Sequence, residues 1–195
     1  MKAPFLVVEL LLLVSLTVGQ RAPESDGRWW LSKGNDERVE FLAGYLDCYV
    51  NNFGDTKTFT ESWYTYEQRI TRYYQQNPHG VARHVTSVLF DVRSENPPNP
   101  HKDGEDWIEK HGFFNGEYWR EIGTTQRTAF IEGYLACHRE HLSSRPEHFS
   151  KSATIYEEQI SHRLGIDAAD PSDINSKLED VAIADVLYKF ADRQK

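Results

Sequence analysis

Regular alternation of apolar and polar residues, which is typical of β-strands, is missing from this 195-residue sequence. After its first nineteen residues it also lacks any apolar stretch long enough to cross a membrane. Positive charge is in the minority, with 22 Lys and Arg against 30 Asp and Glu and a net charge of −8. We therefore predict an all-α fold, and we expect neither nucleic acid nor an anionic membrane surface as a partner.

Motifs of well-known enzyme classes are missing as well. The sequence contains no Gly-x-Ser-x-Gly, phosphate loop, dinucleotide-binding fingerprint or His-Glu-x-x-His. Di-metal sites in helical bundles use Glu-x-x-His, and neither Glu67 nor Glu157 is followed by that histidine. No cofactor is predicted, and the sequence favours a non-enzymatic protein.

The N-terminal residues 1–19 resemble a secretory signal peptide. Lys2 precedes an apolar run from residue 5 to residue 19 that only Glu9 interrupts, and small residues lie near Gly19. Cleavage after Gly19 fits best, and the alternatives are cleavage after Ala22 or retention of the segment as an anchor. We therefore expect an exported protein, either periplasmic or secreted.

An eleven-residue stretch occurs twice, at 38–48 and at 127–137, with Arg, Phe, Gly, Tyr, Leu and Cys identical at six positions. The copies are 89 residues apart, and such a match indicates an internal duplication. We predict two tandem pseudo-symmetric repeats, residues 20–92 and 107–195, joined by a Pro-rich linker at 93–106.

Each repeat is predicted to contain a short Trp-containing helix followed by three further helices. The short helices cover residues 25–34 and 115–123. The central helices follow directly, and their predicted N-capping residues are Asn35-Asp36 in one repeat and Thr124-Thr125 in the other.

The remaining helices are predicted from capping signals and apolar stripes. A capping box at 58–61 opens the second helix of the first repeat, and a matching stripe follows residue 149 in the second. The third helices should begin at Pro78 and Pro171 and end near residues 92 and 191. An additional short helix is expected at 107–111.

Two glycines, Gly44 and Gly133, lie inside the predicted central helices. Glycine in a helix interior costs about 1 kcal/mol relative to alanine, so both copies accept this cost at the same position. The pattern predicts close approach by another helix or an aromatic ring. Access of a ligand to the backbone is the alternative.

The sequence contains two cysteines, Cys48 and Cys137, which occupy equivalent positions of the repeated stretch. Export and an even cysteine count favour a disulfide between them. Two buried free thiols, one in the core of each repeat, are the alternative. The distance between the two Cα atoms decides between these interpretations.

The repeated arginines are the leading candidates for ligand contacts. Each shares a helix face with aromatic residues, so its charge needs a partner, and a repeated glutamate on the next helix can supply one. The arginines then form either structural ion pairs or a bidentate site for a carboxylate or phosphate. The candidate ligand-binding residues are Arg38, Arg127, Tyr45, Tyr134, Glu67 and Glu157.

A second candidate site lies in the stretch Cys137-His138-Arg139-Glu140-His141. Cys137 and His141 are four residues apart, so they share a helix face and could chelate a soft divalent metal. The equivalent stretch of the first repeat contains no histidine, which favours ordinary surface histidines and no metal. A small metal-assisted hydrolase using His138 and His141 is the enzymatic alternative.

The Gly-Tyr-Leu-x-Cys helix, in an exported all-α protein, resembles small periplasmic immunity proteins of the Tai type over about one helix. No individual residue is transferred from that resemblance. Taken together, the patterns favour an exported, non-enzymatic helical binding or interaction protein whose partner is a protein or a small ligand. The alternatives are the hydrolase and a structural component of the cell envelope.

Overall fold

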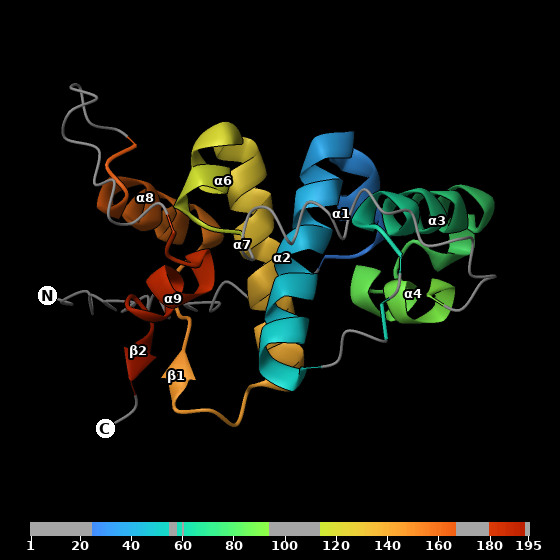
Figure 1. The fold of residues 1–195 in the computed structure, drawn as a ribbon. Coiled ribbons are helices and arrows are strands. Elements are labelled where there is room, and N and C mark those ends of the chain that lie inside the picture. The colour runs from blue at the N-terminus through green and yellow to red at the C-terminus, as the bar shows by residue number, and fades with distance from the viewer. Residues whose placement is uncertain (1–24, 55–57, 60, 94–113, 167–179, 194–195) are drawn as a thin grey trace, which may run out of the picture.

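The computed structural model describes residues 25–54, 58–59, 61–93, 114–166 and 180–193, and two long helices pack side by side at its centre (Figure 1). They are α2 (Asn35–Phe53) and α7 (Thr124–His141). The first half, residues 25–93, adds α1 (Gly27–Ser32), α3 (Trp63–Gln76), a 3-10 turn (Pro78–Gly80) and α4 (Val85–Val92). The second half, residues 114–193, adds α6 (Gly116–Glu121), α8 (Ala153–Arg163) and α9 (Ile183–Tyr188).

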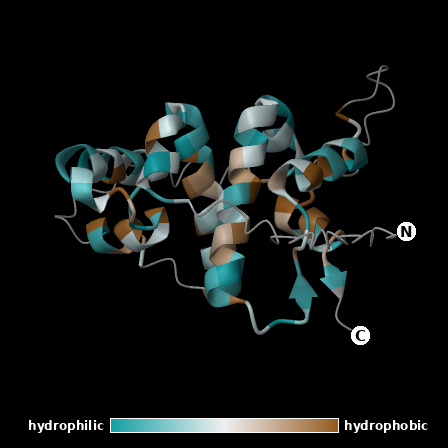
Figure 2. Ribbon diagram, turned by 180° about the vertical axis from the view of Figure 1, so that it is seen from behind, coloured by the Kyte–Doolittle hydropathy of each residue, from teal (hydrophilic) through white to brown (hydrophobic). Residues whose placement is uncertain are grey.

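The prediction of a mostly helical fold is confirmed. The described residues add one short antiparallel ladder, in which β1 (Glu147–His148) pairs with β2 (Asp192–Arg193). Each flanking helix carries both hydrophobic and hydrophilic residues in Figure 2, as expected of amphipathic helices that cover a core. Within the described residues, no helix combines the length and the apolar character needed to span a bilayer.

The starts of the central helices differ from the prediction by one residue. The N-cap residues are Gly34 and Gly123, and the helices begin at Asn35 and Thr124. The Gly34 amide donates to Glu37 Oε2 at 3.0 Å, and the Gly123 amide donates to Gln126 Oε1 at 2.8 Å. A side chain three residues into the helix therefore caps each start, because glycine has no side chain of its own to accept a hydrogen bond.

Close approach of the central helices explains their internal glycines. A Cβ atom on Gly44 would overlap the carbonyl oxygen of Phe130 and lie 2.7 Å from its carbonyl carbon. A Cβ atom on Gly133 would overlap the carbonyl oxygen of Phe41 and lie 2.8 Å from its carbonyl carbon. The packing prediction is confirmed, since each glycine admits the backbone of the other helix.

The flanking helices begin later than predicted. Helices α3 and α8 follow the N-caps Ser62 and Ser152, whose hydroxyls accept from the amides three residues on, so the prediction that residues 58–61 open the second helix is wrong. The predicted third helix of the first half is also interrupted: Pro78 starts only a 3-10 turn, and α4 begins at Val85. In the second half α9 ends at Tyr188, earlier than predicted.

Backbone hydrogen bonds attach the last helix of each half to the start of its short helix. Val85 N donates to Ser25 O at 2.8 Å, and Ile183 N donates to Phe114 O at 2.8 Å. Helix α9 therefore has the same attachment in its half as α4 has in the first. The predictions that concern residues 1–19, residues 94–106, the helix at 107–111 and Pro171 lie outside the described residues.

Candidate functional site

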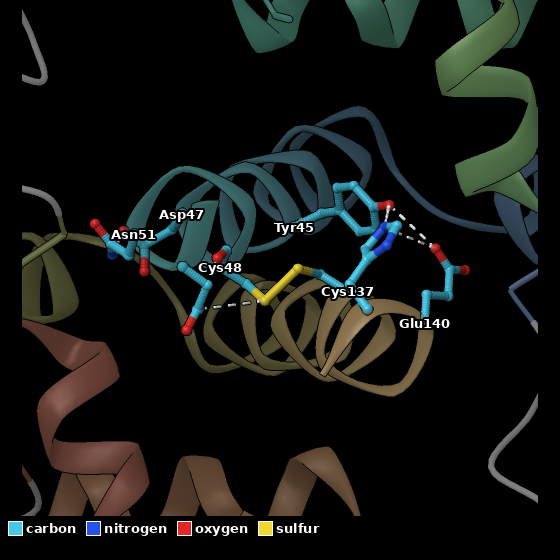
Figure 3. The surroundings of a disulfide bond; sticks show 8 residues. Tyr45, Asp47, Cys48, Asn51, Cys137 and Glu140 are labelled. Atoms are coloured by element: carbon cyan, nitrogen blue, oxygen red, sulfur yellow. Dashed lines mark hydrogen bonds and ion pairs between the residues drawn. A yellow bond between two sulfur atoms is a disulfide. The ribbon is translucent and has the colours of Figure 1, made fainter. Parts of the chain in front are cut away.

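A disulfide between Cys48 and Cys137 joins the two central helices (Figure 3). Their Cα atoms are 6.2 Å apart, within the range that a disulfide requires, and both residues are fully buried. The predicted pairing is confirmed, and no cysteine is free. Cys137 therefore has no thiolate to offer a metal together with His141.

Arg38 lies in a partly buried polar network of the first half. Its NH1 atom is 3.2 Å from Glu67 Oε1 and donates to Thr71 Oγ1 at 2.8 Å. The same hydroxyl accepts from Trp30 Nε1 at 2.8 Å and donates to Glu67 at 2.8 Å. Thr71 is thus the shared partner of the arginine, the tryptophan and the acid.

Arg127 has an equivalent network in the second half. Its NH1 atom is 3.6 Å from Glu157 Oε1 and donates to Ser161 Oγ at 3.4 Å, and its Nε donates to Trp119 O at 2.6 Å. Ser161 also accepts from Trp119 Nε1 at 3.0 Å and donates to Glu157 at 2.8 Å. Both arginines are thus bonded within their own halves, in the ion pairs that were one of the two predicted interpretations.

Tyr45 connects the two halves beside the disulfide. Its hydroxyl donates to Glu140 Oε2 at 3.0 Å and lies 3.0 Å from His141 Nε2. A phenol has one proton, so while Tyr45 donates to Glu140, the ring nitrogen of His141 donates to the tyrosine oxygen. The other oxygen of Glu140 accepts from Thr86 Oγ1 at 2.6 Å. Burial, followed by the nearby Glu140, raises the pKa of Tyr45, so the phenol stays protonated.

Aromatic rings surround His141 at the C-terminal ends of α2 and α7. Its ring centroid lies 5.6 Å from Tyr49, 5.7 Å from Phe53 and 6.1 Å from Phe90, each in an edge-to-face arrangement. Phe53 is 47% exposed, and the side chain of His141 is 30% exposed. We call the following residues the His141 cluster: Tyr45, Tyr49, Phe53, Thr86, Phe90, Glu140 and His141.

His138 belongs to a different group of rings. Its centroid is 4.7 Å from Phe149 and 6.2 Å from Tyr188, and the residue is only 4% exposed. Burial lowers the pKa of His138, which keeps the ring neutral near neutral pH. The two histidines share none of these ring partners. Within the described ranges, no group of three or more His, Cys, Asp or Glu residues could hold a metal.

On the other side of the disulfide from Tyr45 and Glu140 lie Asp47 and Asn51 (Figure 3). Asp47 is 3% exposed, and one of its oxygens accepts from Asn51 Nδ2 at 2.9 Å. Its Oδ2 has no hydrogen-bond partner among the residues that the structure describes. Burial, despite the hydrogen bond from Asn51, raises the pKa of Asp47 to about 8.

Sequence reasoning selected Tyr45 but missed Glu140, Thr86 and the rings around His141. The partners of Tyr45 are 95 and 96 residues away along the chain, so no local spacing could reveal them. Thr71 and Ser161 were missed too, although a signal exists, because both carry a hydroxyl four residues after the repeated glutamate.

The chain matches no family model, no curated protein and no solved structure.

Proposed function

We propose that this chain is an exported, non-enzymatic binding protein built from two tandem pseudo-symmetric repeats, and that the His141 cluster forms its binding surface. We call two residues counterparts when they lie 89 or 90 positions apart in the sequence. The repeat proposal rests on contacts of the first half that recur between the counterpart residues of the second half. These contacts include the two arginine networks and the two glycine contacts.

Export is supported by two independent features. The first nineteen residues have the composition of a signal peptide, and the cysteines are paired. Disulfides form and persist in oxidising compartments and are rare in the cytosol. An exported protein meets both conditions.

The observation that carries the binding proposal is a difference in exposure between counterpart positions. Tyr49 is half-buried and adjoins the exposed Phe53, whereas the counterpart of Tyr49, His138, is buried. Large aromatic side chains left partly in water around polar groups are typical of binding surfaces. A structural envelope component would need no such difference between the halves.

The hydrolase alternative has less support. It requires His138 and His141 at one centre with a carboxylate, but the two histidines contact separate groups of rings. His138 is also buried, where a substrate would not reach it. We therefore favour binding over catalysis.

Affinity capture from the exported fraction of the source cells tests the proposal with a matched pair of variants. Phe53→Ser removes the most exposed ring of the cluster, whereas Ile155→Ser removes an apolar side chain that is 42% exposed on α8. We expect one partner to be retained by the native chain and by Ile155→Ser but lost by Phe53→Ser. Equal retention by all three chains, with unchanged melting temperatures, contradicts this assignment of the surface.

A further inference from the structure

Glu140 presents a carboxylate without a strong cationic partner. Each of its oxygens accepts one hydroxyl hydrogen, from Tyr45 or Thr86, and a carboxylate has about four acceptor positions in total. Among the described residues, no lysine or arginine lies within ion-pair distance of it, and His141 Nε2 is 3.8 Å away. Its side chain is 37% exposed, so the remaining acceptor positions can be reached from solvent.

The rings beside Glu140 offer faces that attract cations. An aromatic face carries partial negative charge, and guanidinium groups bind over it. The chain itself provides one example, because the Arg93 guanidinium carbon lies 4.9 Å from the ring centroid of Phe90. The ring centroids of Phe53 and Tyr49 lie 5.1 Å apart, and Phe53 remains 47% exposed. A second cation can therefore approach these rings next to the carboxylate.

The counterpart positions at the end of α2 do not provide these groups. Asn51 and Asn52 are the counterparts of Glu140 and His141, and they donate to Asp47 and to the backbone oxygen of Cys48. The acid at this position is therefore specific to one half.

We propose that the His141 cluster binds an arginine side chain of a partner polypeptide, and this inference rests on the proposed function. The guanidinium donates to the free acceptor positions of Glu140 and lies against the rings of Phe53 and Tyr49. Arginine fits better than lysine, because its planar group donates bidentately to a carboxylate and stacks on aromatic rings. The net charge of −8 also favours a basic partner.

An NMR titration of the full chain with N-acetyl-arginine amide tests the inference directly. N-acetyl-citrulline amide is the matched control ligand, because it has nearly the same shape without the positive charge. We expect saturable shifts of the Phe53 and Tyr49 ring signals with the arginine compound and at least a tenfold weaker response to citrulline. No shifts with arginine, as would follow if another segment or a second copy covers the cluster, overturn the inference.

Glu140→Gln is the decisive variant, since it removes the charge, keeps one acceptor oxygen for Tyr45 or Thr86, and places an amide donor toward the other hydroxyl, which can turn to accept from it. Glu121→Gln makes the same change in net charge at an exposed position of α6. We expect arginine binding to weaken at least tenfold in Glu140→Gln and to stay within twofold in Glu121→Gln. Equal binding to native chain and Glu140→Gln overturns the inference.

The capture experiment separates this inference from the proposed function. A partner that is lost with Phe53→Ser but retained at full strength by Glu140→Gln leaves the binding surface in place and rejects arginine recognition. A partner retained by both variants rejects the surface itself. Loss of the partner with both variants, together with the arginine-dependent shifts, supports both conclusions.

Discussion

The ring centroids of Phe59 and Tyr66 in the first half lie 5.7 Å apart at an interplanar angle of 88°, and those of Phe149 and Tyr156 in the second half lie 5.6 Å apart at 85°. The hydroxyls of both tyrosines accept a backbone amide five residues earlier in the chain. These two buried contacts are therefore the same in both halves, as expected where close packing leaves little room for change.

The C-terminal ends of α2 and α7 differ much more. Glu140 and His141 of α7 reach across to Tyr45, whereas Asn51 and Asn52 of α2 donate hydrogen bonds within their own helix. These positions lie at or near the surface, where a substitution usually changes stability by little. The comparison indicates that polar contacts can change at helix ends while the matched ring and hydroxyl contacts of the interior are kept.

A second difference concerns acids buried in only one of the central helices. Glu40 and Asp47 of α2 are 9% and 3% exposed, and their counterparts on α7 are Ala129 and Ala136. Burial raises the pKa of each acid to about 8, and in Glu40 the nearby Asp36 adds to the increase. These two acids therefore introduce pH dependence at positions where α7 has alanine.

Removal of the disulfide is expected to have the largest effect, because this bond joins the two halves directly. Cys48 and Cys137 are 89 residues apart, and the chain-entropy model gives such a loop about 4–5 kcal/mol as an upper value. We expect Cys48→Ala/Cys137→Ala to lose most of this free energy of unfolding in a denaturant titration. Unchanged stability of the variant would contradict the expectation. Labelling of two thiols per chain would also contradict it, when the protein with the native sequence is unfolded without reductant.

The glycine contacts should give the next largest effect and should be equal in the two halves. Gly44→Ala and Gly133→Ala each place a methyl group on the backbone of the other helix, so the helices must separate. Overpacking of this kind costs about 1–3 kcal/mol, and we expect values near the upper end. Denaturant melts provide the measurement. Gly34→Ala is the control, since its Cβ would meet only a side-chain oxygen at 3.4 Å.

The sequence predicted the parts of the fold that depend on positions repeated along the chain. The central helices, the contacts of Gly44 and Gly133 and the Cys48–Cys137 pair were predicted because each appears twice with the same spacing. The break before α4 was not predicted, because the Asn77-Pro78 signal that starts a helix also starts a 3-10 turn. Neither propensity nor periodicity distinguishes the two.

The candidate site was harder to predict than the fold. Tyr45, Glu140 and Thr86 meet only after three helices pack together, and nothing in their local sequences indicates the contact. His141 was predicted to be an ordinary surface histidine, and its spacing to Cys137 pointed only to metal binding as an alternative, not to the contact with Tyr45. The disulfide uses the Cys137 sulfur that a metal site with His141 would need. In the folded chain, His141 instead packs against aromatic rings.

Titration of Asp47 should distinguish the central helices by their pH dependence. The folded-state pKa of about 8 exceeds the value of about 4 for a free aspartate, so the unfolded chain releases this proton first. The contribution of Asp47 to the free energy of unfolding is therefore fully present below pH 4, decreases between pH 4 and pH 8, and no longer changes above pH 8. Each pH unit between 4 and 8 lowers the free energy of unfolding by up to about 1.4 kcal/mol.

Asp47→Asn should therefore stabilise the protein at pH 7 and leave it unchanged at pH 4. We expect a gain of roughly 1–3 kcal/mol at neutral pH, because asparagine cannot ionise, although its amide still occupies the position where Oδ2 lacks a partner among the described residues. Asp47→Ala, which introduces the α7 residue, is a second test of the same difference. Denaturant melts at pH 4 and pH 7 provide the measurement, and equal effects at both values reject the assignment.

The hydroxyl groups of Thr71 and Ser161 should give the smallest effects and the finest comparison of the halves. Each hydroxyl accepts from an arginine and a buried tryptophan, so its removal leaves the tryptophan N–H without a partner and the arginine NH1 with only its glutamate. Ser161 is 2% exposed, whereas Thr71 is only partly buried, and water can replace the lost partner more easily at Thr71. We expect a loss of roughly 1–3 kcal/mol for Ser161→Ala and about 1 kcal/mol or less for Thr71→Val. Thermal melts, supported by the fluorescence of Trp30 and Trp119, provide the measurement. Equal losses would mean that solvent reaches both networks alike, and a larger loss at Thr71 would reverse the ranking of the two halves.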